Sequence, residues 1–416
     1  MKSVSVASRQ HLATTSKPRA LDVFARRLVL DKLSQIENGH IAVVDGADTW
    51  LFGEAEHQAE LKASILVRDA AFYSDIAFGG SIGAGESYMD SHWKCSDLVS
   101  LVRILLRNRA VLDSMETGLA RLTRPLQKAF HWVNRNTRAG ARRNISAHYD
   151  LGNEFFALWL DESMMYSSAI YEQPGMNLAE AQTARLDQVC EKLALGPADR
   201  VIEIGTGWGG FAVHAASEYG CHVTTTTISR EQYDFTARRV EAAGVQDRVE
   251  LLLEDYRDLH GTYDKLVSIE MIEAIGWKQF DTYFAKCSEL LKPGGEMLIQ
   301  AITIADQQFE RAKRSVDFIQ RYIFPGSNLT SVASMSQAIA SRTDLQITAL
   351  EDIGLHYAQT LRDWRRSFLL KLPEVRDLGY PEAFIRMWEY YFCYCEGGFL
   401  ERAISDVHLR ARKPAY

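Results

Sequence analysis

The sequence predicts a doubly wound α/β domain with a mostly parallel sheet, preceded by a smaller α+β domain. The chain has 416 residues, more than a single hydrophobic core usually serves. Apolar residues make up 47% of the chain and charged residues 24%, which is an ordinary globular composition. Beyond Pro197, apolar strands alternate with helical segments, and this alternation is typical of a parallel sheet covered by helices.

The smaller domain is expected between residues 21 and 115. The polar residues 1–20 precede it, and we expect them to be disordered. Asp45-Gly46 separates two apolar runs, which is the usual signal of a hairpin turn. From apolar spacing we predict a helix over 21–35, a hairpin over 41–52, a strand over 61–67 and a helix over 98–112.

A basic segment, residues 116–145, links the two predicted domains. It contains no acidic residue after Glu116, and its apolar residues fall at helical spacing. Such a helix can lie on a lipid surface with its cations near phosphate groups. It can equally be a solvated linker helix that packs on its own domain. The sequence leaves both interpretations open.

The larger domain is expected over residues 146–416. Leu291 and the Lys-Pro-Gly-Gly sequence after it predict the end of a helix that leads into a fifth strand. Near the C-terminus, Val407, Leu409 and Ala411 alternate with polar neighbours and predict a last, antiparallel strand. The other expected strands are 201–204, 222–227, 249–253, 265–269 and 296–302.

Charge and cysteine usage limit the function classes. The net charge of -7 gives no general attraction to nucleic acid, and we expect no nucleic-acid partner. The six cysteines show no CxxC pair and no zinc-site spacing, so we predict no metal site and a reduced, cytoplasmic chain. Neither a signal peptide nor a membrane-spanning run is evident, and any contact with a membrane is expected at its surface.

A glycine-rich loop follows the first strand of the larger domain. Residues 201–210, VIEIGTGWGG, place four glycines directly after an apolar strand, where bare backbone can approach a ligand. The pattern also satisfies GxGxxG, so a nicotinamide oxidoreductase must be considered. That class requires an acidic residue about twenty positions later, and this region holds only Val223 and four threonines. With Glu203 before the first glycine, the pattern favours S-adenosylmethionine.

The ordered set of motifs in this chain resembles cyclopropane-fatty-acyl-phospholipid synthases, which are S-adenosylmethionine-dependent methyltransferases. The resemblance covers nearly the whole chain and implies the class I methyltransferase fold, with a lipid-binding N-terminal domain. The motifs are GESYMD at 85–90, HYDLGN at 148–153, MYSSAIY at 165–171, the glycine loop, LEDYRDL at 253–259, SIEMIE at 268–273, YIFPG at 322–326, HY at 356–357 and YYFCYCEG at 390–397.

The resemblance implies a cofactor site. An aromatic face at Tyr166 suits the sulfonium through cation–π attraction, and Thr227 and Gln232 can hydrogen-bond to ribose or adenine. Gln232 also stands at capping-box spacing from Ser229, and both roles can hold at once. The implied cofactor residues are Tyr166, Ser167, Gly205, Gly207, Gly209, Thr227, Gln232, Asp255 and Tyr256.

The resemblance also implies a base. Methyl transfer to an isolated alkene generates a carbocation, and ring closure then requires removal of a proton from the new methyl group. The family is thought to hold bicarbonate for this step through a Cys, a Glu, a His, an Ile backbone group and a Tyr. The matching positions here are Ser168, Glu273, Gln300, Ile302 and Tyr357, and the resemblance adds Tyr149 and Cys395 to the candidate catalytic residues.

Three positions depart from the family pattern. Ser168 and Gln300 replace Cys and His, and Ala274 replaces the His that often follows the Glu. Gln cannot become cationic and Ser is a weaker acid than Cys, so anion binding is weakened. These departures concern ring closure and not methyl transfer. The expected product is therefore a cyclopropane or, as the alternative, a methyl-branched unsaturated acyl chain.

The resemblance implies partners and a location. The expected substrate is the unsaturated acyl chain of a membrane phospholipid, reached from the cytoplasmic face by a peripheral protein. Relatives are commonly dimers, so a homodimer is expected.

Overall fold

The computed structural model describes residues 19–117 and 152–416, and these residues form two compact units. Of the described residues, the first unit contains 19–117, 316–323 and 371–403. The second contains 152–315, 324–370 and 404–416. The chain therefore returns to the first unit twice after it has entered the second, a connection that the predicted contiguous domain over 146–416 did not include.

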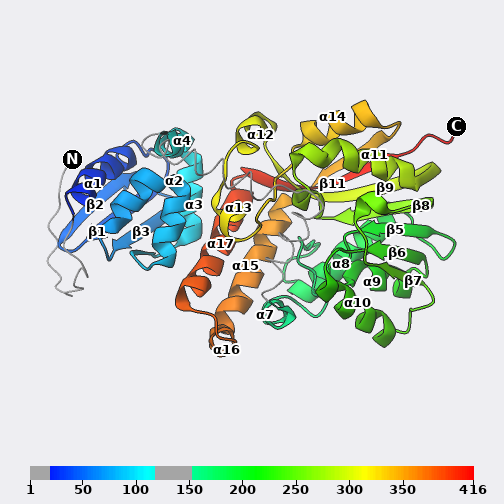
Figure 1. The fold of residues 1–416 in the computed structure, drawn as a ribbon. Coiled ribbons are helices and arrows are strands. Elements are labelled where there is room, and N and C mark those ends of the chain that lie inside the picture. The colour runs from blue at the N-terminus through cyan, green and yellow to red at the C-terminus, as the bar shows by residue number, and fades with distance from the viewer. Residues whose placement is uncertain (1–18, 118–151) are drawn as a thin grey trace. The chain divides into compact units, whose positions relative to one another are not determined.

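The first unit is built on a four-stranded sheet in the order β2-β1-β3-β4 (Figure 1). The predicted hairpin is β1 with β2, which pair in antiparallel fashion, and β3 lies parallel to β1 on its other side. The strands are β1 (His40–Asp45), β2 (Asp48–Gly53), β3 (Lys62–Val67) and β4 (Trp93–Cys95).

Helices of the first unit pack on one another and on this sheet. The predicted helix over 98–112 is two helices, because the buried Asn108 side chain donates to the carbonyls of Ile104 and Asn38 and ends the first helix. Late in the chain, α17 packs against α2 and α3. The helices are α1 (Ala20–Leu33), α2 (Ala71–Met89), α3 (Leu98–Arg107), α4 (Arg109–Thr117), α13 (Phe318–Tyr322), α16 (Leu372–Asp377) and α17 (Glu382–Leu400).

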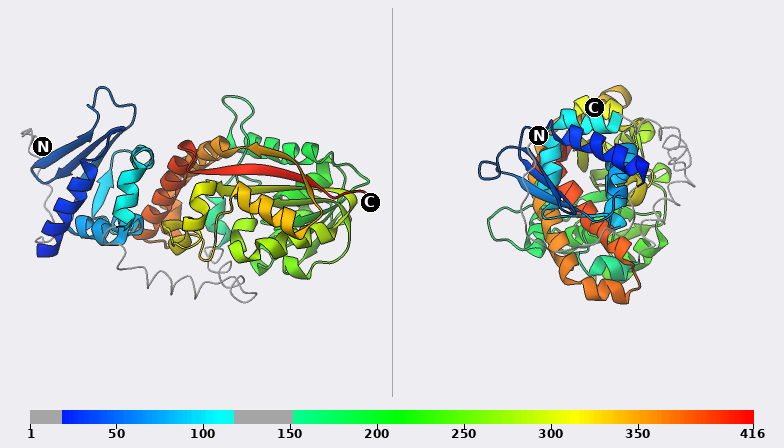
Figure 2. Two further views of the ribbon diagram at one scale, coloured as in Figure 1. Left: turned by 90° about the horizontal axis from the view of Figure 1, so that it is seen from above. Right: turned by 90° about the vertical axis from the view of Figure 1, so that its left-hand side faces the viewer.

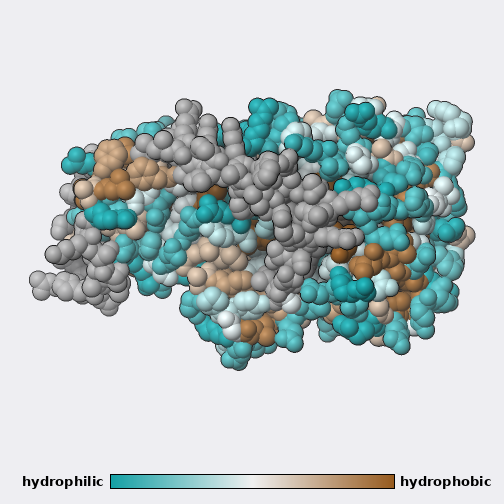
Figure 3. Space-filling model, viewed as in Figure 1, coloured by the Kyte–Doolittle hydropathy of each residue, from teal (hydrophilic) through white to brown (hydrophobic). Residues whose placement is uncertain are grey.

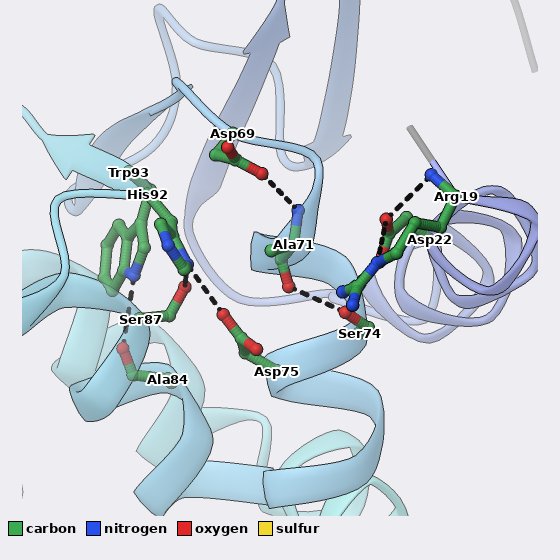
Figure 4. A network of polar contacts seen from close by, with 10 residues as sticks. All are labelled: Arg19, Asp22, Asp69, Ala71, Ser74, Asp75, Ala84, Ser87, His92 and Trp93. Atoms are coloured by element: carbon green, nitrogen blue, oxygen red, sulfur yellow. Dashed lines mark hydrogen bonds and ion pairs between the residues drawn. The ribbon is translucent and has the colours of Figure 1, made fainter. Parts of the chain in front are cut away.

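A polar network fixes α1 and β4 to α2 (Figure 4). Buried Asp22 accepts hydrogen bonds from the Arg19 guanidinium and from the Ser74 hydroxyl. His92 Nδ1 lies 2.8 Å from Asp75 Oδ2 and 3.4 Å from the buried Ser87 hydroxyl. Because one ring nitrogen faces both groups, this cluster lacks the two-sided geometry of a Ser-His-Asp catalytic triad. Its role is structural.

The second unit is built on a seven-stranded sheet in the order β10-β11-β9-β8-β5-β6-β7. Strands β9, β8, β5, β6 and β7 are parallel, and β11 is antiparallel to β9, which confirms the predicted last strand. The strands are β5 (Arg200–Ile204), β6 (His222–Thr226), β7 (Val249–Leu252), β8 (Tyr263–Ile269), β9 (Leu291–Ile304), β10 (Gln346–Asp352) and β11 (Ile404–Arg412).

Helices cover both faces of this sheet (Figures 1 and 2). One buried cluster joins the sheet to α11 and α14, and another joins it to α8, α9 and α10. This is the predicted doubly wound architecture. The helices are α7 (Asn153–Ala157), α8 (Leu178–Lys192), α9 (Gly210–Glu218), α10 (Arg230–Ala242), α11 (Phe280–Leu290), α12 (Asp306–Ala312), α14 (Val332–Arg342) and α15 (Gly354–Leu370).

Two details of this unit differ from the prediction. Helix α11 ends at Leu290 as expected, but β9 already begins at Leu291, five residues before the predicted start, and a register shift in its pairing with β8 accommodates the glycines. Strand β10 was not predicted, because it lies at the sheet edge and six of its seven residues are exposed.

Candidate active site

The glycine loop lies between β5 and α9. Gly205, Gly207 and Gly209 have φ angles of 103°, 54° and 81°, in the region that favours glycine. A Cβ atom at Gly209 would lie 2.6 Å from Thr236 Cγ2, whereas a Cβ at Gly207 would meet no atom within 4 Å. The loop is thus closed on one side by packing and open at Gly207. This geometry suits close approach of a ligand to the backbone.

Thr227 and Gln232 meet where β6 ends. The Thr227 hydroxyl donates to Gln232 Oε1 at 2.8 Å, and the Gln232 backbone N–H donates to the Ser229 hydroxyl that caps α10. The Gln232 side chain does not complete the expected capping box, because the Ser229 backbone N–H donates to the Thr227 hydroxyl instead. The Gln232 side chain lies beside Thr227, at the edge where the ends of β5 and β6 are adjacent.

Asp255 and Tyr256 follow β7, the next strand of the sheet. Both Asp255 carboxylate oxygens accept hydrogen bonds from Arg257, at 2.8 and 2.6 Å. Tyr256 is buried, and burial raises the pKa of its hydroxyl. Apart from Tyr166 and Ser167, the predicted cofactor residues thus follow three neighbouring strands, at the carboxyl edge where ligands of doubly wound sheets bind.

Tyr166 lies in an aromatic cluster. Its ring centroid is 5.3 Å from that of Trp159, 5.3 Å from Trp364, 5.5 Å from Phe156 and 5.8 Å from Phe324. Aromatic faces attract cations, so the cluster suits the sulfonium of S-adenosylmethionine. Together with the open backbone at Gly207, the residues present fit this cofactor.

Glu270 is the central group of the predicted catalytic residues, although sequence reasoning did not select it. It follows β8 directly and has a φ angle of 47°, a strained conformation for a residue other than glycine. Its Oε1 accepts from the Ser168 backbone N–H at 2.7 Å and from Gln300 Nε2 at 2.9 Å. Its Oε2 accepts from the Tyr357 hydroxyl at 2.7 Å.

Three of the groups expected to hold bicarbonate therefore bind a protein carboxylate instead. The Ser168 amide, the Gln300 amide and the Tyr357 hydroxyl converge on Glu270, while the Ser168 hydroxyl donates to the Ala169 carbonyl. A second anion at this place would have to displace Glu270 or lie against its charge. The described residues do not fit bicarbonate, and no step is assigned to it.

Glu273 and Ile302 form a second contact in this site. The Ile302 backbone N–H donates to Glu273 Oε1 at 2.5 Å, while Glu273 Oε2 has no hydrogen-bond partner among the described residues. Burial, reinforced by the neighbouring Glu270, raises the pKa of Glu273 to about 8. At neutral pH Glu273 is thus mainly a neutral acid, and Glu270 is better supplied with donors for a negative charge.

Two candidate residues are not part of this cluster. Tyr149 lies outside the described residues. Cys395 lies on α17, in the first unit, whereas the other described candidates lie in the second. Burial raises the pKa of the Cys395 thiol, which opposes thiolate formation. The catalytic role predicted for these two residues stays a prediction.

The sequence held one signal for Glu270. A carboxylate directly after an apolar strand, at the carboxyl edge of a parallel sheet, stands where active-site residues usually lie. Glu273 is predicted on this ground, and Glu270 stands directly at the end of β8, where the same reason holds. The partners of Glu270 come from three separate segments, so their convergence could not be found by spacing.

Comparison with known proteins decides the family. The family model described as mycolic acid cyclopropane synthetase matches residues 136–409, more than half of the chain. The chain belongs to this family. Family membership establishes an S-adenosylmethionine-dependent methyltransferase and removes the nicotinamide oxidoreductase alternative.

Two curated relatives of the mycolic acid cyclopropane synthetase family are similar over most of the chain. The tuberculostearic acid methyltransferase of Mycobacterium tuberculosis is 38% identical over 358 residues, 83% of this chain and 83% of that protein. The cyclopropane-fatty-acyl-phospholipid synthase of Escherichia coli K12 is 38% identical over 351 residues, 82% of this chain and 86% of that protein. Homologues are thus cyclopropane synthases and lipid methyltransferases.

Solved structures of the same family confirm the class I methyltransferase fold. The cyclopropane synthase MmaA2 of Mycobacterium tuberculosis has a TM-score of 0.61 at 27% identity, covering 65% of this chain and 98% of its own. The same values hold for a mycolic acid cyclopropane synthase complexed with SAH and CTAB. Within residues 19–117 and 152–416, no helix has the length and apolarity needed to span a bilayer.

Proposed function

We propose that this enzyme methylates the double bond of unsaturated acyl chains in membrane phospholipids and releases a methyl-branched unsaturated chain. The observation that carries the proposal is Glu270, whose carboxylate takes the donors expected for bicarbonate. The names of the relatives do not choose between a branched and a cyclic product, because one is a methyltransferase and another a cyclopropane synthase.

The residues of the site supply what the reaction requires. S-adenosylmethionine, when bound, provides an electrophilic methyl group. The aromatic cluster around Tyr166 stabilises positive charge and excludes water, which would otherwise capture the carbocation formed on the acyl chain. The Glu270 carboxylate accepts the proton that this cation loses.

The position of the base supports the branched product. In the relatives that the sequence resembles, ring closure depends on a small anion beside the new methyl group. Here the base is a side chain held at the end of β8 by three donors, and Ser168 and Gln300 replace the Cys and His of that anion site. A base held at a different place is expected to take a proton from a neighbouring chain carbon. Ring closure with Glu270 as the base is the second candidate.

Product analysis tests the proposal. Purified enzyme is incubated with methyl-labelled S-adenosylmethionine and vesicles of monounsaturated phospholipid, and the released acyl chains are examined by mass spectrometry and proton NMR. We expect labelled chains without upfield cyclopropane protons, and no label in matched vesicles of saturated phospholipid. Upfield ring protons would establish the cyclopropane product, and unlabelled lipid would refute the substrate class.

An exposed apolar surface of the first unit supports membrane contact. Leu21 and Phe24 on α1 are 47% and 52% exposed, and Leu51 on β2 is 58% exposed. Figure 3 shows apolar surface over α1. Arg19 and Arg26 near these side chains are paired with Asp22 and Asp45, so the apolar side chains carry the proposed lipid contact. The basic segment 116–145, for which lipid docking is one of two interpretations, lies mostly outside the described residues.

Replacing Phe24 and Leu51 with Ala tests this surface. Each side chain buried in lipid contributes about 1.5–3 kcal/mol, so we expect binding to anionic phospholipid vesicles to fall at least tenfold. Vesicle cosedimentation measures the change. The matched control is Leu350→Ala, which removes a side chain of similar exposure, 46%, from β10 of the second unit. If the Phe24 and Leu51 variant, the Leu350→Ala control and the unchanged protein all bind vesicles equally, these side chains do not form the lipid-binding surface.

A further inference from the structure

Glu270 has a second carboxyl group beside it. Asp406 on β11 is completely buried, and its carboxyl group lies close enough to that of Glu270 for each to shift the ionisation of the other. The Gln300 side chain bridges the two, since its Nε2 donates to Glu270 Oε1 at 2.9 Å and to Asp406 Oδ2 at 2.8 Å. Two buried carboxyl groups in such contact cannot both be ionised at low cost, so they hold a proton between them.

The hydrogen-bond donors around Glu270 and Asp406 indicate which of the two carboxyl groups is ionised. Glu270 accepts from a backbone amide, a side-chain amide and a tyrosine hydroxyl. Asp406 Oδ2 accepts from Gln300, and Asp406 Oδ1 has no hydrogen-bond partner among the described residues. An ionised carboxylate needs donors on both oxygens when it is buried, whereas a neutral acid does not. The negative charge therefore belongs to Glu270 and the proton to Asp406. Burial raises the pKa of both carboxyl groups, and that of Asp406 lies well above its usual value.

The charged groups buried around Glu270 and Asp406 are consistent with a single negative charge on these two carboxyl groups. Arg185 on α8 is fully buried, and two of its guanidinium nitrogens have no hydrogen-bond partner among the described residues. It interacts electrostatically with Glu270, Asp406, Asp161 and Glu203, and one cation cannot balance four anions. Other ionisable groups lie near the two carboxyl groups or near the Gln300 side chain that bridges them. They are Glu273 after β8, Tyr357 and His356 on α15, Lys192 on α8 and His408 on β11.

The bridging amide is held in one orientation. His408 Nε2 lies 3.2 Å from Gln300 Oε1, and Lys192 Nζ lies 2.9 Å from His408 Nδ1. Lysine can only donate, so Nδ1 is the acceptor, Nε2 carries the proton, and the ring donates to the Gln300 carbonyl oxygen. The Gln300 NH₂ group must then face the two carboxyls. Lys192 is itself paired with Glu351 at 2.6 Å.

We propose that Asp406 is a positioning residue that shares a proton with Glu270, so that the pair holds one proton before the reaction and two after it. This inference rests on the proposed function. A C–H bond of the carbocation on the acyl chain breaks, its electron pair forms the new carbon–carbon double bond, and the proton passes to the Glu270 carboxylate. Asp406 keeps its own proton throughout and directs it at Glu270. One proton then leaves the pair for solvent before the next turnover.

Infrared spectroscopy of the protein without lipid tests the resting state. The difference spectrum between the unchanged protein and Asp406→Asn is expected to contain the C=O band of one protonated carboxylic acid at neutral pH, shifted in heavy water. The matched control is Asp264→Asn, because Lys292 lowers the pKa of Asp264 and keeps it ionised. Loss of a carboxylate band instead of an acid band in Asp406→Asn would overturn the proposal.

The pH profile of labelled methyl transfer tests the role in turnover. An Asn side chain can donate to Glu270 as a protonated Asp does, so Asp406→Asn should keep activity within about threefold at neutral pH, whereas Asp406→Leu should lose at least tenfold. In the unchanged enzyme, ionisation of Asp406 at high pH removes this donor and lowers the rate. That loss should be absent from Asp406→Asn.

The two readouts separate the possible failures. Absence of lipid methylation by the unchanged enzyme would refute the proposed function and leave the infrared assignment as the test of the pair. An active enzyme whose Asp406→Asn and Asp406→Leu variants have the same neutral-pH rate and the same alkaline limb would overturn the positioning role. Rescue by Asn and not by Leu, with the alkaline limb removed, is the result that we expect.

Discussion

Replacing Glu270 with Gln is expected to lower product formation by a factor of about 10² to 10⁴, the usual contribution of a positioned general base. Gln has nearly the same shape and can still accept from the Ser168 amide, but it cannot take a proton from the carbocation. The rate is measured as label from the methyl group of S-adenosylmethionine incorporated into monounsaturated phospholipid.

Measuring cofactor affinity distinguishes loss of the catalytic base from disruption of the fold. Calorimetric binding of S-adenosylmethionine should change by less than about twofold in Glu270→Gln, because the described cofactor candidates are other residues. Glu310→Gln is the matched control, since Glu310 is an exposed residue of α12 with ion pairs to Lys313 and Arg314. Glu270→Gln with full activity would exclude Glu270 as the base and return that role to Glu273.

Replacing Gly209 with Val is expected to remove measurable binding of S-adenosylmethionine. Gly209 has a φ angle of 81°, and a Cβ atom there would lie 2.6 Å from Thr236 Cγ2 and 3.3 Å from Thr236 Cβ. A branched side chain must push the loop away from α10, and this movement displaces the backbone that the cofactor approaches. Isothermal calorimetry measures the loss.

A second glycine separates this clash from backbone strain alone. Gly244 also has a positive φ angle, 68°, but a Cβ atom there would meet nothing within 4 Å. Gly244→Ala should cost about 1–2 kcal/mol of stability and leave cofactor affinity unchanged. Far-UV circular dichroism confirms that both variants are folded. Tight binding by a folded Gly209→Val would show that the cofactor does not approach this part of the loop.

The larger sheet could be predicted because its central strands are buried on both faces. Such strands appear as continuous apolar runs bounded by turns, as in residues 201–204 and 265–269. Strand β10 has no such run, since it lies at the sheet edge and most of its residues are exposed. Helix α2 was missed for a different reason: its four glycines weaken the helical pattern, and Gly80 kinks it with a φ angle of 59°.

The candidate site was predictable where a local motif carries it. The glycine loop and the residues after β6 and β7 follow directly from strand ends, and these strands are neighbours in the sheet. Glu270, Asp406 and His408 were not predicted, because their role depends on tertiary contacts between β8, β9 and β11 that the sequence does not show. Asp406 and His408 alternate with apolar residues, a pattern that is typical of polar side chains on the solvent face of a strand. Helix α15 packs against β11, and both residues are buried.

Strand β11 has a consequence for the order in which the enzyme is made. It consists of Ile404–Arg412, yet it lies inside the sheet between β9 and β10 and contributes Asp406 and His408. A chain emerging from the ribosome can therefore pair β5, β6 and β7 and close the glycine loop long before these residues exist. The surroundings of Glu270 are completed only when residues 404–412 have been translated. Until that moment a nascent chain can hold a methyl donor but lacks the carboxyl partner of its base.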